Sequence, residues 1–138
     1  MLKVSVGQHE GWIGEGQISY GGPGAVARAR LAADLVAGRL ALFGPSTTDI
    51  RYDLIGLDAL HGGASRPAGE PYEVRLRIAG RVSTEANAWR VAREVESLYT
   101  NGPAGGGGAT TIVKPVLAMR STLVPRASVA WRVDYETV

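Results

Sequence analysis

A glycine-rich turn followed by two arginines is the first place in the sequence where chemistry could occur. Gly21, Gly22 and Gly24 surround Pro23, and Arg28 and Arg30 follow within a predicted helix. A helix start leaves backbone N–H groups unpaired and carries a partial positive charge, so it attracts carboxylates and phosphates. Guanidinium groups bind the same anions in fork geometry. These five residues therefore predict an anion site, for instance for a carboxylate or a CoA phosphate.

A structural turn is the competing interpretation of the same residues. Pro23 removes one of the N–H donors that an anion would use. The spacing matches neither a Walker A motif nor a dinucleotide-binding motif, and no lysine follows the glycines. Both interpretations of the turn stay open at this stage.

Glu15, Tyr20 and His61 are the other side chains that could take part in a reaction or a binding site. Glu15 and Tyr20 flank the turn and could act as an acid and a proton donor, although a glutamate among glycines is often only solvated or capping. His61 follows an apolar strand, and sites gather at strand ends in α/β sheets. His9 is the second histidine and no close pair of carboxylates is present, so a metal site is not predicted.

Composition restricts the class of protein. The chain has 138 residues, which suits a single domain over 1–138, and 45% of them are hydrophobic. It has no cysteine, so disulfides and thiolate metal sites are excluded, and no apolar run is long enough for a membrane span. We therefore expect a cytoplasmic protein without a cofactor. Thirteen of its fifteen basic residues are arginine.

The hydrophobic pattern predicts two helices, at about 24–43 and 84–99, the second capped by Ser83. The first would bury a stripe that includes Leu31 and Leu35, and the second a stripe with Val91 and Val95. Glycine clusters at 7–24, 56–69 and 102–108 indicate loops. Alternating apolar residues predict strands at about 2–6, 49–57, 72–82, 111–120 and 129–136.

This order predicts an α+β fold, the ferredoxin-like split βαβ arrangement (β-α-β-β-α-β) with one extra strand at the end. Both helices would lie on one face of an antiparallel sheet, in a two-layer sandwich. A three-layer α/β fragment is the alternative. Pro115 predicts an edge strand or a bulge for 111–120.

The strand at 72–82 carries arginines opposite its apolar residues, at positions 75, 77 and 81. In a two-layer fold this sheet face is open, so a partner could cover it. Nucleic acid is not the expected partner, because base-binding sheets of this type expose aromatic residues and the net charge is only +2.

Four segments of the chain resemble the C-terminal part of the acyclic terpene utilization family, AtuA. They are GWIGEGQISYGGPGA, YDLIGLDALHG, PYEVRLRIAGR and EVESLYTNGPAGGGG, in the family's order. Members of that family are usually several times longer, so the resemblance implies a tail domain that lacks the large α/β region. It also implies a link to the breakdown of citronellol- or geraniol-type compounds through acyl-CoA thioesters. It assigns no catalytic residue.

Two functions follow as hypotheses. The first is an accessory or oligomerisation domain, which would use the open sheet face or the glycine-rich turn to contact a second copy or the larger AtuA-like region. The second is a binding site for an acyl-CoA or a carboxylate, built from the turn at 21–30 with Glu15, Tyr20 and His61. The residues leave open whether the domain is an enzyme.

Overall fold

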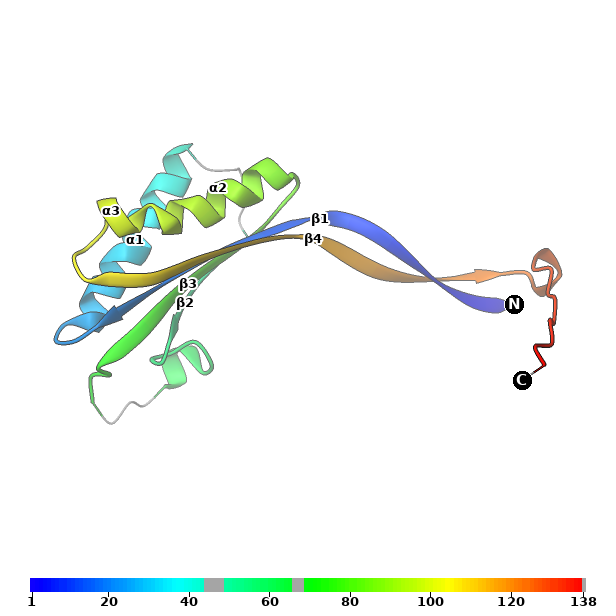
Figure 1. Cartoon of the computed structure of the whole chain (residues 1–138), viewed down its shortest axis with the longest axis horizontal. Helices are drawn as coiled ribbons and strands as arrows, with labels where there is room; N and C mark the ends of the chain where they lie inside the picture. Colours follow the sequence, from blue (N-terminus) through cyan, green and yellow to red (C-terminus); the bar gives the residue numbers. More distant parts are fainter. Residues whose placement is uncertain (44–48, 66–68, 138) are drawn as a thin grey trace.

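The computed structural model describes residues 1–43, 49–65 and 69–137. Four strands form one antiparallel sheet in the order β2-β3-β1-β4. Helices α1 and α2 both cover the same face of this sheet, as predicted (Figure 1). The elements are β1 (Leu2–Gly21), α1 (Ala25–Phe43), β2 (Ile50–Ile55), η1 (Gly62–Ala64), β3 (Glu73–Val82), α2 (Glu85–Glu96), α3 (Leu98–Asn101), β4 (Gly106–Val124) and η2 (Arg126–Ser128).

The glycine-rich stretch before the turn is a strand, so the prediction of a loop there is wrong. β1 runs without interruption from residue 2 to residue 21 and is an inner strand of the sheet. Its even-numbered residues from 14 to 20 are buried under the helices. The side chains of Ile18 and Tyr20 are fully buried there and belong to the hydrophobic core.

Two positions in β1 require glycine because α2 packs directly on the strand. A Cβ atom at Gly14 would lie 2.0 Å from the carbonyl oxygen of Ala88, and one at Gly16 would lie 2.4 Å from Cβ of Val95. Real Cβ atoms do not approach other heavy atoms this closely. Glycine at these positions therefore allows α2 to pack close to the strand, although glycine weakens most strands.

The fourth strand is longer than predicted. β4 begins at Gly106 and includes most of the glycine cluster that was expected to be a bridge. It is an edge strand of the sheet, which confirms the position predicted from Pro115. The pairing of β1 with β4 shifts between His9 and Trp12, and Pro115 lies opposite Trp12 at this irregularity.

Both helices form where the pattern predicted them, with corrections in detail. In α1 the leucines that were predicted to be buried are not, since Leu31 and Leu35 are 52% and 40% exposed. The helix instead buries Ala25, Ala29, Ala32, Val36 and Leu40. In α2 the capping residue is Thr84, not Ser83, because the Thr84 hydroxyl accepts a hydrogen bond of 3.3 Å from the backbone N–H of Asn87. Val91 and Val95 are fully buried, as predicted.

The extra strand predicted at 129–136 does not form. Residues 129–137 have no regular secondary structure, and after Val124 the chain passes through η2. Residues 2–9 and 117–124 pair with each other beyond the end of β3 and extend as a two-stranded ribbon, called the arm below. The arm projects from the helix-covered sheet, and both termini lie at its far end (Figure 1).

The close approach of α2 to β1 predicts a large effect of Gly14→Ala. The added methyl group must displace the helix backbone, so we expect the free energy of unfolding to fall by about 3 kcal/mol or more. Gly38→Ala is the matched control, because a Cβ atom at this helical position meets no atom within 4 Å. The control should gain up to about 1 kcal/mol. Chemical denaturation measures both values, and equal stabilities of the two variants would contradict this packing.

Candidate functional site

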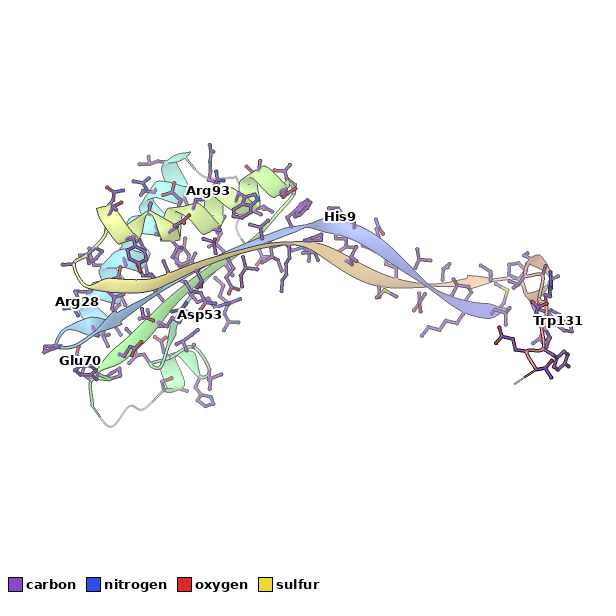
Figure 2. All side chains as sticks on the ribbon, viewed as in Figure 1. His9, Arg28, Asp53, Glu70, Arg93 and Trp131 are labelled. Carbon is purple, nitrogen blue, oxygen red and sulfur yellow. The ribbon has the colours of Figure 1, made fainter. Side chains whose placement is uncertain are left out.

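The structure does not bring the predicted site residues together. Glu15 lies on the face of the sheet opposite the helices, while Tyr20 lies in the core beneath them. His61 belongs to the segment between β2 and β3, directly before η1. The turn with Arg28 lies at the end of the domain that is remote from the arm (Figure 2).

Arg28 is bound to the turn itself. Its guanidinium group donates hydrogen bonds to the carbonyl oxygens of Gly21 and Pro23, the latter at 2.9 Å. The backbone N–H of Ala25 donates to the carbonyl oxygen of Gly22 at 3.1 Å. Gly22 and Gly24 have φ angles of 79° and 73°, a conformation that favours glycine. This geometry supports the interpretation of the turn as a structural feature held closed by Arg28.

Tyr20 is a buried phenol in the hydrophobic core. Its side chain is fully buried, and its hydroxyl group has no hydrogen-bond partner among the residues that the structure describes. Burial raises the pKa of the Tyr20 phenol, and the positive charge of Arg28 offsets this only in part. The hydroxyl group is therefore held in its neutral form and away from solvent.

Glu15 belongs to an ion-pair network that crosses three strands on the sheet face opposite the helices. Arg77 donates to the carboxylate of Glu15 at 2.5 and 2.9 Å, and to the carboxylate of Asp53 at 2.9 Å. Asp53 is the buried polar residue of this network and also accepts from Arg51 at 2.7 Å. Burial raises the pKa of Glu15, but the hydrogen bonds from Arg77 and Gln17 outweigh it and lower that pKa below its usual value.

Arg75 extends this network toward β4. Its guanidinium group donates to Gln17 at 2.6 Å, to Ser19 at 3.0 Å and to Thr110 at 3.0 Å. The prediction that arginines line this face is confirmed. Their guanidinium groups are engaged by polar groups of the same sheet, which makes this face a self-paired polar surface.

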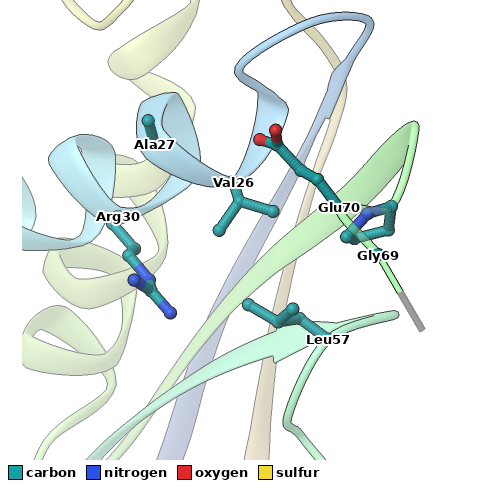
Figure 3. Close-up of a pocket in the computed structure, with 7 residues that line it drawn as sticks. Val26, Ala27, Arg30, Leu57, Gly69 and Glu70 are labelled. Atoms are coloured by element: carbon teal, nitrogen blue, oxygen red, sulfur yellow. The ribbon is translucent and has the colours of Figure 1, made fainter. Parts of the chain in front are cut away.

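Arg30 is the one predicted residue that lines a cavity beside α1, which has a volume of about 370 Å³. Figure 3 shows Val26 and Arg30 reaching into it from α1, while Leu57 and Glu70 approach from the other side. A smaller cavity of about 170 Å³ adjoins it, lined in part by Gly22 and Glu70. The complete lining of the larger cavity is Val26, Ala27, Arg30, Leu57, Gly69, Glu70 and Pro71.

Sequence reasoning missed Glu70 and Leu57, because their place beside α1 depends on how β2 and β3 pair. Glu70 lies outside every motif identified in the sequence, and Leu57 lies within YDLIGLDALHG, where nothing marks it as a site residue. His61 and Tyr20 do not line this cavity.

The arm exposes several large apolar side chains. Its side chains alternate, and both faces carry exposed apolar residues among polar ones. At its base, Glu10 accepts hydrogen bonds from Arg81 at 2.8 Å and from Arg120. These contacts tie both strands of the arm to β3. The exposed apolar residues of the arm include Val4, Val6, Leu117, Met119 and Leu123.

The ion pair of Glu15 predicts a pH-dependent contribution to stability. Because the pKa of Glu15 is lowered in the folded state from the usual 4.5, its contribution is present above that pH and is lost as the pH falls through the folded-state value. We expect Glu15→Gln to lower the free energy of unfolding at pH 7 by about 1–2 kcal/mol. The variant should also lose less stability than wild type below pH 4.5. Urea denaturation at several pH values measures this, and parallel pH profiles would disprove the role of the ion pair.

A family model covers nearly the whole chain. The family model described as acyclic terpene utilisation family protein AtuA matches residues 1–135. No curated protein and no solved structure matches the chain. None of the described helices is long and apolar enough to cross a membrane. Since the match covers nearly the whole sequence, the chain belongs to the acyclic terpene utilisation AtuA family.

Proposed function

We propose that this chain is an accessory domain that assembles with a second copy of itself, in a protein of acyclic terpene or related acyl-CoA catabolism. The family match supports the link to acyclic terpene utilisation. The observation that carries the assembly role is the arm, which projects from the rest of the domain with apolar side chains on both faces.

The surface area of the chain supports an assembly. Its accessible surface is 9300 Å². A compact monomer of 14.5 kDa is expected to expose roughly 6,900 Å². The excess of roughly 2,400 Å² is well above the approximately 800 Å² that each partner buries in a typical stable interface.

The unpaired backbone edges of the arm also favour a partner that covers it. An isolated two-stranded ribbon is only marginally stable in water. Residues 2–9 of β1 pair with β4 alone, and β4 is an edge strand, so the arm has an unpaired backbone edge on each side. A second arm, related by a two-fold axis, offers the same edges and the same apolar side chains in complementary order.

The polar face of the sheet is a weaker candidate for this contact. Glu15, Asp53, Arg75 and Arg77 already satisfy one another or neighbouring polar groups. Separating such pairs to meet a partner would cost free energy. The larger AtuA-like region remains the alternative occupant of the arm.

We also infer that the fold is the ferredoxin-like split βαβ arrangement, without the extra strand. The strand order β2-β3-β1-β4, the antiparallel pairing of all neighbours and the two helices on one face support this inference.

The assembly proposal predicts that charges on one face of the arm separate the copies. Leu117→Glu with Met119→Glu places two carboxylates on exposed arm positions, so the folded domain should persist while the assembly is lost. Sedimentation velocity should give a multiple of the single-chain mass for wild type and the single-chain mass for the variant. Leu60→Glu with Tyr72→Glu is the matched control, since both residues are exposed and lie outside the arm. A wild-type chain that stays single at all concentrations would refute a second copy as the partner.

A second candidate function is the binding of an acyl-CoA or a carboxylate in the cavity beside α1. A volume of about 370 Å³ falls in the range of small-molecule sites. Arg30 provides a positive charge at the cavity, and Val26 and Leu57 provide apolar walls. The carboxylate of Glu70 would repel an anionic head group, so that group would lie nearest to Arg30 and the acyl chain against Val26 and Leu57.

Binding in this cavity predicts a thermal shift with acyl-CoA esters. A ligand that binds only the folded state raises the melting temperature, and Arg30→Ala should abolish that rise. Arg126→Ala serves as the control, because Arg126 lies in η2 beyond the arm and should leave the shift unchanged. An equal shift in wild type and Arg30→Ala would exclude this site.

A further inference from the structure

The segment after the arm, residues 129–136, has the side-chain pattern of a strand but no strand partner. Trp131 and Tyr135 are 83% and 93% exposed, and Val129 and Val133 are also exposed. The Nε atom of Arg132 donates to the carboxylate of Asp134 at 2.7 Å. A contact between residues two positions apart is what an extended chain produces, since alternate side chains lie on the same side. The segment is therefore already arranged with apolar and charged sides.

This segment does not pair with any strand in the described part of its own chain. Pro125 and η2 separate the segment from β4 by only a few residues, yet none of residues 129–137 pairs with a described strand. Trp131 lies with the chain terminus beyond the end of the arm (Figure 2). Large exposed aromatic side chains next to unpaired strand edges are the components of strand addition between chains.

Charge favours the arm as the acceptor. Residues 2–9 and 117–124 contain Lys3 and Arg120 and no carboxylate, while residues 129–136 contain Arg132, Asp134 and Glu136. Arg120 is paired with Glu10 at the base of the arm, so Lys3 provides the remaining positive charge of the arm, while the segment is acidic overall. Each copy has one segment and one arm, so a reciprocal exchange closes at two copies and leaves neither part exposed.

We propose that residues 129–136 form a strand by pairing with the arm of a second copy of this chain. The proposal rests on the assembly proposed above and specifies how it is built. In the assembly the arm becomes the inner part of an intermolecular sheet, and Trp131 and Tyr135 cover its apolar side chains. The fifth strand that the sequence pattern indicates then exists only between two copies.

Disulfide trapping tests this pairing, and the chain contains no native cysteine to interfere. Val133→Cys is combined in turn with Val4→Cys, Val6→Cys, Leu117→Cys or Met119→Cys in the full chain, under mild oxidation. At least one pair should give a covalent dimer that reducing agent separates. Val133→Cys with Tyr72→Cys is the control and should give none, because Tyr72 lies outside the arm.

The strength of the assembly provides a second measurement. Val133→Pro removes a backbone donor and should raise the dissociation constant of the dimer at least tenfold, while Val133→Thr, which suits a strand, should change it little. A wild-type dimer that neither cross-links nor responds to Val133→Pro would overturn this inference and leave the assembly proposal intact. Cross-links confined within one chain would also overturn it, and a wild-type monomer would remove both proposals.

Discussion

The contact between α2 and β1 is the constraint on which the rest of the structure depends. The helix lies so close to the strand that the backbone of Ala88 and the side chain of Val95 occupy the space where side chains of residues 14 and 16 would be. This contact places α2 over the inner strand and leaves α1 to cover the neighbouring part of the sheet. The aliphatic residues of β3, among them Leu76 and Ile78, then complete one core under both helices.

A consequence of this layering is that the two faces of the sheet have different roles. The covered face contains the core, and the opposite face contains guanidinium and carboxylate groups that pair across strands. Arg77 bridges Glu15 on β1 and Asp53 on β2, so it links strands on both sides of its own. The polar face thus helps to hold the sheet together, and the arm is left as the surface that lacks a partner.

Much of the architecture could be predicted from the sequence, because the helices and the strand at β3 have clear periodicity. The valines of α2 and the apolar residues of β3 indicate their buried sides directly. The glycine-rich strand could not be recognised, because glycine normally disfavours strands and is required here by the packing of α2, which lies far along the chain. The predicted site residues do not come together for the same reason. A loop could bring Glu15 and Tyr20 close to each other, whereas a strand places their side chains on opposite faces of the sheet. Of the predicted site residues only Arg30, which lies on a correctly predicted helix, lines the cavity of about 370 Å³ beside α1.

Pro115 lies at the base of the arm and affects how far along β4 a strand from a second chain could pair. Pro115 has no backbone N–H group, so β4 lacks one donor at the position between the arm and the globular part. A strand added along the arm, as proposed above, would meet this position before it reached the globular part of the edge. An edge strand of 19 residues is a ready template for open-ended pairing with other chains, and a proline on such a strand is one of the devices that limit this pairing.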